Sequence, residues 1–474
     1  GSRADPAQYR PVALTSHITK VFERVIRKSL VTHLEAQGLL PSSQHGFRQY
    51  RSTLTQLLSH WDSILDCLEQ GETVDVIYTD LSKAFDKCET NVLLHTLREC
   101  GVKGRMGLWI SSFLDPTTRK QAVGVDGRVS DLVPVVSGVP QGTVLGPVLF
   151  LIHIRCISAR ISPGTSSSSF ADDTKVWRGV RSDEDCQLLQ TDLQSTYDWA
   201  DQVNMVFNSE KFEWLRYSVN PDAAPSFQYL SPDSSTIEQK SNLRDLGVRL
   251  SSDLSFSLQI EKVVTTASQM VGWGLRTFRS RGSYLLLTMF KSLVQPHLDY
   301  CSQLWCPSAQ EAINKIERVQ RSLISRISDS RLAGANYWEK LRVLRLYSQE
   351  RRRERYLIIF IWKISQGLVE GYDIPFTPLD ARTGRKAVPA SICQSAPSCV
   401  RKAREGSLAV KGVQLFNLMP TQLRNSDHGD VEMFKNHLGI YLSNILDQPT
   451  VAGMVRGAQS NSLLHQVPLY EYSP

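Results

Sequence analysis

Residues 166–177 read SSSSFADDTKVW, two short β-prone runs that meet at an acidic pair. A strand, a tight turn and a returning strand fit this pattern best. Neighbouring side chains of a strand point to opposite faces, so Asp172 and Asp173 can share one site only where the backbone turns. The stretch therefore predicts a hairpin whose tip suits a cation, although a lone Asp-Asp pair is more often an ordinary surface turn.

The chain contains 474 residues, of which 41% are hydrophobic and 21% are charged. This length predicts several subdomains with a core large enough to fold without disulfides. The sequence shows no secretory signal, and its longest apolar run, residues 144–154, is too short to span a bilayer. We therefore expect a soluble intracellular protein without a membrane partner.

The nine cysteines are odd in number, widely scattered and free of any C-x-x-C pair. Such usage favours a reducing compartment and excludes a disulfide framework. The spacing of His297, Cys301 and Cys306 could be accommodated in a metal site, but packing in the core is the simpler interpretation.

The net charge of +7 is unevenly distributed. Between Lys315 and Lys363 there are 13 Lys or Arg residues but only 5 Asp or Glu residues. This basic segment indicates a polyanion as partner, with a solvated helix face as the alternative. Within it, residues 331–366, which include the run 351–355 (RRRER), could lie against such a polyanion or form an amphipathic helix.

The hydrophobic pattern changes near residue 255. Before that point strands and helices alternate, with a β-branched strand over residues 74–80 and a helix over 183–203. Beyond it, apolar residues recur at helical spacing in 259–278, 283–294, 308–327 and 337–366. The last hundred residues are expected to be loosely organised, except for one helix near 431–446.

Three carboxylates are predicted to end strands. Asp80 closes the strand over residues 74–80, and the acidic pair follows about 90 residues later. Converging carboxylates at strand ends can bind Mg²⁺ and leave coordination positions for phosphate oxygens. The arrangement is typical of polymerases and nucleases.

The order of the motifs adds a resemblance to a known family. Residues 78–87 (YTDLSKAFDK), 137–147 (SGVPQGTVLGP) and 170–173 (FADD) resemble motifs A, B and C of reverse transcriptases from non-LTR (LINE-type) retrotransposons, jockey-like ones most closely. Further segments resemble the fingers motifs, motif D, the primer grip and the helical thumb of these enzymes: 10–14 (RPVAL), 44–48 (QHGFR), 208–211 (NSEK), 246–248 (LGV), 297–305 and 316–321.

The resemblance implies an α+β protein with a right-hand polymerase fold, an antiparallel-sheet palm and a helical thumb. The implied subdomains are incomplete fingers over 1–73, a palm with inserted fingers elements over 74–255, a thumb over 256–330, and a basic helical segment with a C-terminal extension over 331–474. The implied activity is RNA-directed DNA polymerisation. Its partners would be an RNA template, dNTPs and a DNA primer or nicked target DNA, in the nucleus and cytoplasm.

The resemblance implies a role for each residue that stands at a functional position of a matching motif. Asp80 and Asp172 would hold two Mg²⁺ ions, with Mn²⁺ as a possible substitute and Asp173 adjacent but less essential. Lys211 is a candidate proton donor to the leaving pyrophosphate. Phe85 would occupy the space that a ribose 2′-OH needs, which selects dNTPs over rNTPs; packing in the core is the alternative.

The remaining implied contacts concern the incoming nucleotide. Arg10 would meet its triphosphate, and Leu81 and Ser82 follow Asp80 in motif A. Gln141 and Gly142 would approach the nucleotide and template base, a close approach that glycine permits.

The sequence departs from the family pattern at two places, and these departures bear on an alternative function. Phe170 stands where many reverse transcriptases have Tyr, and only nine residues precede Arg10, where the family has a basic strand of the fingers. These features are compatible with a truncated copy. The alternative function is therefore a catalytically inactive relic that only binds RNA or RNA–DNA hybrid.

Overall fold

The computed structural model describes residues 12–220, 222, 224–378, 384–425, 430–449 and 461–470. Two compact units are distinguished. The sheet unit comprises residues 1–52, 73–216 and 220–240, and the helical unit comprises 53–72, 217–219 and 241–474.

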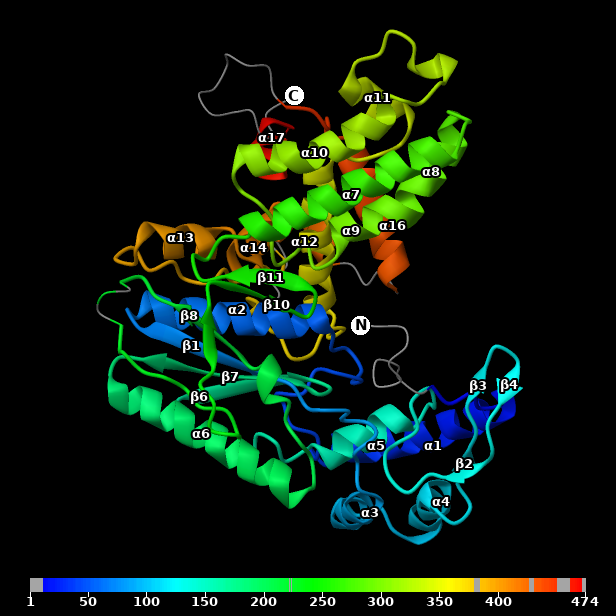
Figure 1. The fold of residues 1–474 in the computed structure, drawn as a ribbon. Helices are drawn as coiled ribbons and strands as arrows, with labels where there is room; N and C mark the ends of the chain where they lie inside the picture. Colours follow the sequence, from blue (N-terminus) through cyan, green and yellow to red (C-terminus); the bar gives the residue numbers. More distant parts are fainter. Residues whose placement is uncertain are drawn as a thin grey trace. The chain divides into compact units, whose positions relative to one another are not determined.

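The sheet unit is built on a five-stranded sheet with the strand order β6-β7-β1-β8-β9 (Figure 1). The strands are β1 (Thr73–Thr79), β6 (Thr165–Phe170), β7 (Asp173–Val180), β8 (Glu213–Tyr217) and β9 (Glu238–Lys240). The central strand β1 pairs antiparallel with β7 along its whole length, and β7 pairs antiparallel with β6. Strand β1 is buried nearly throughout, which explains its β-branched and apolar sequence.

Helices and two short hairpins complete the sheet unit. The helices are α1 (His17–Ala36), α3 (Thr90–Glu99), α4 (Gly104–Leu114), α5 (Gly146–His153) and α6 (Asp183–Gln202); the short strands are β2 (Lys120–Gln121), β3 (Gly124–Val125), β4 (Arg128–Val129) and β5 (Val133–Pro134). Helix α6 packs against β7, and acidic side chains in its first turn complement the helix dipole. Helix α5 is apolar except for His153 at its end, and all of its residues but Pro147 are buried.

The helical unit contains one hairpin and a set of packed helices. Its strands are β10 (Asn242–Asp245) and β11 (Val248–Ser251), and its helices are α2 (Thr53–Glu69), α7 (Ser257–Thr277), α8 (Ser283–Met289), α9 (Gln295–Asp299), α10 (Gln310–Ile324), α11 (Tyr337–Val343), α12 (Gln349–Ser365), α13 (Ser398–Glu405), α14 (Val413–Asn417), α15 (Thr421–Asn425), α16 (Val431–Ser443) and α17 (Leu463–Tyr470). Helix α12 packs against α10, α14 and α16. None of the helices in the described ranges is long and apolar enough to cross a membrane.

Most predicted elements are confirmed, but two predictions in the second half are wrong. The single helix expected over 337–366 is two helices, α11 and α12, because Arg345 has a φ of 53° and Ser348 caps a new helix. Leu246 and Gly247 form the turn between β10 and β11, and β11 begins at Val248. The last hundred residues contain several helices besides the predicted one, and helix α4 was not predicted at all.

The arginine run at 351–355 lies in helix α12 and is mostly internal, which favours the amphipathic-helix alternative over a contact with RNA. Arg351 and Arg353 are buried. Arg352 donates to both carboxylate oxygens of Asp299, at 2.8 and 3.1 Å, and Arg355 donates to the backbone carbonyl of Lys435 at 3.0 Å. The run therefore connects segments of the helical unit to one another.

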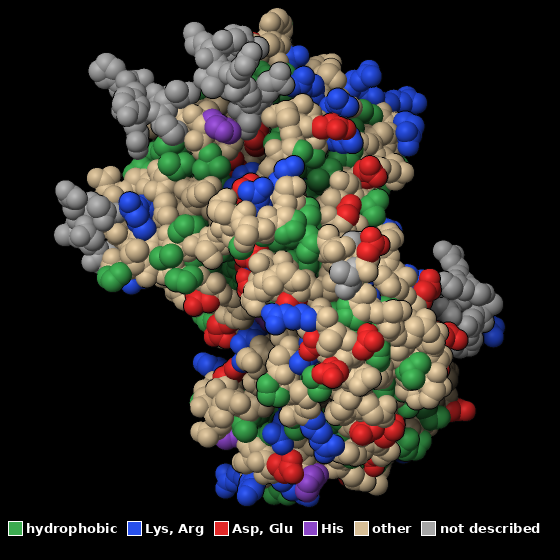
Figure 2. Space-filling model, turned by 90° about the vertical axis from the view of Figure 1, so that its left-hand side faces the viewer, with side chains coloured by type: hydrophobic (Ala, Val, Ile, Leu, Met, Phe, Trp, Pro, Cys, Tyr) green, Lys and Arg blue, Asp and Glu red, His purple; other side chains and the backbone are tan. Residues whose placement is uncertain are grey.

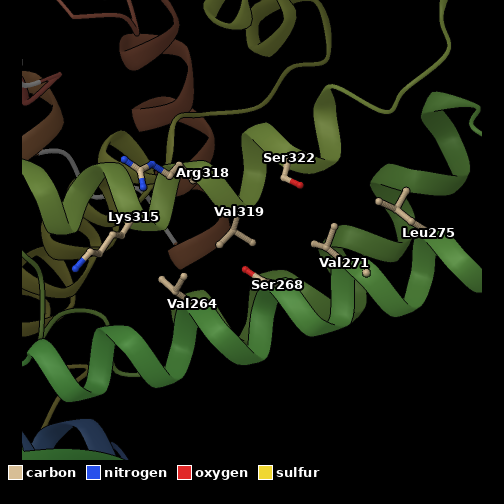
Figure 3. Close-up of a pocket in the computed structure, with 9 residues that line it drawn as sticks. Val264, Ser268, Val271, Leu275, Lys315, Arg318, Val319 and Ser322 are labelled. Atoms are coloured by element: carbon tan, nitrogen blue, oxygen red, sulfur yellow. The ribbon is translucent and has the colours of Figure 1, made fainter.

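An open groove of about 400 Å³ lies between α7 and α10. Figure 3 shows Val264 and Val271 of α7 facing Val319 of α10, with Lys315 and Arg318 at one end. Lys315 forms an ion pair with Glu311 at 2.9 Å. On the face drawn in Figure 2, basic and acidic side chains are mixed over most of the surface.

A buried carboxyl group, Glu317 of α10, makes the stability of the protein dependent on pH. Its carboxylate accepts hydrogen bonds from the backbone N–H of Gln349 at 2.7 Å and from the hydroxyl of Tyr337. Burial nevertheless raises the pKa of Glu317 from 4.5 to about 7. The folded state therefore binds this proton more tightly than the unfolded state does.

We expect the free energy of unfolding to fall as the pH rises from about 5 to about 8, with Glu317 contributing on the order of 3 kcal/mol to the change. The stabilising contribution is complete below the unfolded pKa and is lost as the pH rises through the folded one. Glu317→Gln should abolish this part of the pH dependence in urea unfolding followed by circular dichroism. Glu311→Gln, on the exposed side of the same helix, should retain it; an unchanged pH profile in Glu317→Gln would contradict this account.

Candidate functional site

The three predicted carboxylates lie where strand β1 ends and where β6 turns into β7, at the same end of the sheet. Thr79, the last residue of β1, is paired with Thr174 of β7, so Asp80 follows β1 beside the start of β7. Phe170 pairs with Asp173 across the β6–β7 turn, which leaves Ala171 and Asp172 at its tip. The predicted hairpin is thus confirmed, and the sheet register brings the strand ends together.

A second segment pairs with the backbone around Asp80. The N–H of Asn208 donates to the carbonyl of Asp80, and the N–H of Ser82 donates to the carbonyl of Val206, both at 2.8 Å. Leu81 forms an isolated antiparallel bridge with Phe207 and is itself buried. Asp80 and Ser82 therefore sit on backbone that is held from both sides, whereas Leu81 contributes to the core.

Lys211 reaches the same end of the sheet. It ends a short 3₁₀ turn at Ser209–Lys211, and its Nζ donates to Oδ2 of Asp80 at 2.9 Å. The Lys211 side chain is 59% exposed, so it remains open to a ligand.

Further positive charge surrounds the hairpin. Lys175 of β7 is buried and lies 5.9 Å from the ring centroid of Tyr78. Burial, together with the nearby charges of Arg51, Lys175 and Arg48, lowers the pKa of His45 to about 3. The His45 ring is therefore neutral at physiological pH, and the cationic surroundings favour an anionic ligand.

Phe85 forms part of an aromatic cluster next to the predicted motif B loop. Its ring stacks on Phe150 with centroids 4.3 Å apart, and it meets Phe47 edge-on at 6.2 Å. The N–H of Val139 donates to the Phe85 carbonyl at 2.8 Å. These contacts hold the Phe85 ring in one place. A fixed ring is compatible both with packing in the core and with a steric role beside the nucleotide sugar.

The loop over residues 137–147 packs tightly against the turn that carries Phe85. Gln141 donates through Nε2 to Oδ1 of Asp86 at 3.3 Å, and its carbonyl accepts from the N–H of Ala13 at 2.7 Å. Gly142 has a φ of 92°, and a Cβ there would lie 2.8 Å from the Ala13 carbonyl oxygen. Arg10 lies outside the described residues.

Two acidic residues that sequence reasoning missed support this site. Glu23 of α1 is buried, and its Oε2 accepts from the N–H groups of Val144 and Leu145, at 2.7 and 2.9 Å, just before α5 begins. Asp75 of β1 is likewise buried. The available signal was an acid placed on an otherwise apolar face or strand, a position that charged residues rarely take without a partner.

The donor set at this end of the sheet fits a hard divalent cation, because carboxylate oxygens are the ligands that Mg²⁺ prefers. Within the described ranges, no group of three or more His, Cys, Asp or Glu side chains is already gathered as a metal site. Of the three residues for which core packing was the simpler interpretation, Cys301 is buried, Cys306 is half-buried and His297 is exposed. Core packing therefore holds for Cys301 but not for His297.

The antiparallel strands β6, β7 and β1 carry acids at the end of β1 and at the neighbouring hairpin tip, and a Gly- and Pro-containing loop is packed nearby. This arrangement defines the palm of a nucleic acid polymerase. Sequence comparison identifies which kind. Residues 2–250, about half of the chain, match the family described as reverse transcriptase (RNA-dependent DNA polymerase). The chain belongs to this family, and the predicted α+β right-hand polymerase fold is confirmed.

Similar proteins come from retrotransposons of Drosophila melanogaster. The probable RNA-directed DNA polymerase from transposon X-element is 28% identical over 326 residues, which are 67% of this chain and 35% of the relative. The RNA-directed DNA polymerase from mobile element jockey is 28% identical over 335 residues, 68% of this chain and 36% of the relative. The predicted resemblance is thus confirmed, and the chain spans about a third of the length of these relatives.

Among solved structures, apo telomerase from Candida tropicalis aligns with a TM-score of 0.39 and 12% identity. The alignment covers 73% of this chain and 59% of that chain. This similarity is too distant to inform on function.

The contact between Gly138 and the Phe85 turn can be tested with a matched pair of glycines. Gly138 and Gly127 have φ values of 80° and 78°, but a Cβ would lie 2.8 Å from Asp86 Cα and the Phe85 carbonyl at Gly138, and nothing lies within 4 Å at Gly127. We expect Gly138→Ala to lower the free energy of unfolding by about 1–3 kcal/mol more than Gly127→Ala, as measured by urea titration. Equal losses would show that backbone strain alone matters.

Proposed function

We propose that this chain is the reverse transcriptase portion of a non-LTR retrotransposon protein, which copies RNA into DNA by adding dNTPs to a primer 3′-OH. The observation that carries the proposal is the register of β1 and β7, which brings Asp80 to the hairpin tip at Asp172 and Asp173. Membership of the reverse transcriptase family supports it, as do the names of the similar retrotransposon proteins.

Asp80 and Asp172 are the proposed ligands of two Mg²⁺ ions, for which Mn²⁺ can substitute, and Asp173 is adjacent. When bound, the ions would supply positive charge to the phosphate oxygens of the substrate. Asp80 lies on backbone held by the segment around Asn208, so its carboxylate is oriented before the ligand arrives.

Lys211 is proposed to donate a proton to the leaving pyrophosphate. Its ammonium group contacts Asp80 and is more than half exposed, so it can turn from the carboxylate to a phosphate oxygen. Arg10 is proposed to contact the triphosphate, and Ser82, Gln141 and Gly142 are proposed to border the nucleotide.

The proposed partners are an RNA template, dNTPs and a DNA primer or nicked target DNA. The Arg351–Arg355 run no longer supports RNA binding, since its side chains connect elements of the helical unit. Arg318 at the α7–α10 groove is exposed and is a better candidate for a phosphate contact. The subdomain boundaries and the action in nucleus and cytoplasm stay predictions.

Removal of single carboxylates tests the activity. Asp80→Asn and Asp172→Asn should each lower primer extension on an RNA template by about a hundredfold or more, because the charge that holds the cation is lost. RNA binding, measured by filter retention, should be unchanged. Asp126→Asn, in the exposed turn between β3 and β4, serves as the control and should extend primers normally.

Undiminished extension by the Asp80 or Asp172 variants would refute the proposed site. RNA binding by the unaltered protein without any extension would instead favour the inactive relic.

The preference for dNTPs over rNTPs tests the proposed steric role of Phe85. We expect Phe85→Ala to incorporate rNTPs, lowering the preference for dNTPs by about tenfold or more, because truncation opens space at the ribose 2′ position. Steady-state kcat/KM values for matched dNTP and rNTP pairs measure this preference. Phe113→Ala, another partly buried aromatic of the sheet unit, should change stability but not the preference; a similar loss of preference there would assign Phe85 to packing only.

A further inference from the structure

The tip of the β6–β7 hairpin is held in a conformation that its sequence disfavours. Ala171, directly before Asp172, has a φ of 57°. Residues other than glycine rarely adopt this left-handed region, and they persist there only when their surroundings impose it. The chain must therefore supply a restraint on Ala171.

That restraint is the side chain of Gln44, which is only 2% exposed. Its Oε1 accepts a hydrogen bond from the N–H of Ala171 at 2.9 Å, and its Nε2 donates to the carbonyl of Ala171 at 3.2 Å. One amide group thus binds both polar backbone groups of the residue before Asp172. Oε1 also accepts from the N–H of Gly46 at 2.8 Å.

The backbone around Gln44 is itself attached to the hairpin. The N–H of His45 donates to the carbonyl of Ser169 at 2.8 Å, and the N–H of Ser169 donates to the carbonyl of Ser43 at 2.9 Å. A Cβ at Gly46 would lie 2.4 Å from the nitrogen of Ala171, so only glycine permits this approach. Residues 43–46 form a clamp on the hairpin tip.

The same clamp is anchored to the rest of the sheet unit. Arg51 donates through Nη1 to the carbonyl of Gln44 at 3.2 Å. Arg48 donates to the carbonyl of Pro41 at 2.7 Å and forms a bidentate ion pair with Glu35 of α1. The backbone on both sides of the glutamine is therefore anchored by Arg51 and by the Arg48–Glu35 pair.

We propose that Gln44 is a positioning residue that acts through Ala171 to orient the carboxylate of Asp172 for the catalytic divalent cation. This inference rests on the proposed function. A two-residue turn without such a restraint can take several backbone conformations, and each would orient the next side chain differently. With the amide in place, one conformation is retained and the carboxylate is oriented before the cation binds.

Gln44→Met and Gln44→Glu separate the parts of the clamp. Methionine preserves the length of the side chain but neither accepts nor donates as an amide does, whereas an ionised glutamate can still accept from Ala171 and Gly46 but cannot donate to the Ala171 carbonyl. Binding of Mn²⁺ alone, followed by electron paramagnetic resonance without substrate, gives a measure that does not depend on turnover. We expect Gln44→Met to weaken Mn²⁺ binding about tenfold or more, and Gln44→Glu to have a smaller effect.

Gln320→Met is the matched control. Gln320 is also a buried glutamine with several hydrogen bonds, including one to the Tyr347 carbonyl at 3.0 Å, but it lies in α10 of the helical unit. It should lower the melting temperature without changing Mn²⁺ binding. In primer extension, Gln44→Met should raise the Mg²⁺ concentration for half-maximal rate, while the KM for dNTP changes less.

Normal Mn²⁺ affinity in folded Gln44→Met would overturn the inference, even if the variant is less stable. If Gln44→Met does not fold, Gln44→Glu decides. The inference is then overturned if Gln44→Glu has the Mn²⁺ affinity, the melting temperature and the Mg²⁺ requirement of the unaltered protein. The two levels of the argument remain distinguishable. Loss of Mn²⁺ binding in Asp172→Asn together with normal binding in Gln44→Met refutes only the role of Gln44. Absence of Mn²⁺ binding and of extension in the unaltered protein refutes the proposed function and this inference together.

Discussion

A single buried carboxylate, Asp75, stabilises the centre of the sheet. It accepts from Trp214 Nε1 at 3.0 Å, from Arg216 Nε and Nη2 at 2.7 Å each, and from the hydroxyl of Tyr229 at 2.8 Å. Strand β1 is thereby tied to β8 and to the segment that follows it. A buried ion pair that loses one partner typically costs about 3–5 kcal/mol, so the network holds β1 firmly. Asp80 lies five residues further along the chain, directly after β1, so this network also fixes the position of its backbone.

The same principle recurs wherever the candidate site is supported. Glu23 binds the backbone N–H groups ahead of α5, and Gln44 binds the backbone of Ala171. Each is a buried polar side chain whose hydrogen bonds go to backbone groups outside its own element. Because an unsatisfied buried polar group is costly, each such bond specifies one arrangement of loop and scaffold. The candidate metal-binding carboxylates themselves stay near the surface, while buried neighbours hold the backbone that carries them.

The sequence predicted the hairpin, the strand before Asp80 and helix α6 because local periodicity and turn chemistry decide such elements. It predicted the helical character of the second half for the same reason. It did not predict the break between α11 and α12, since both segments carry one continuous helical pattern and the break depends on Ser348, whose N–H and hydroxyl donate to Asp447. The sequence could not decide between the two alternatives for the arginine run, because burial is not visible in a charge count: Asp299 and distant backbone carbonyls supply its partners.

The sequence alone determined the family, the order of the motifs and the identity of the acids, because those depend on residue type and spacing. Only the tertiary structure decided which residues surround the acids. The pairing of Thr79 with Thr174 places Asp80 next to the hairpin tip, and Gln44 reaches Ala171 across 127 positions of the chain. Such contacts join residues whose separation is set by the fold as a whole, so no local pattern encodes them.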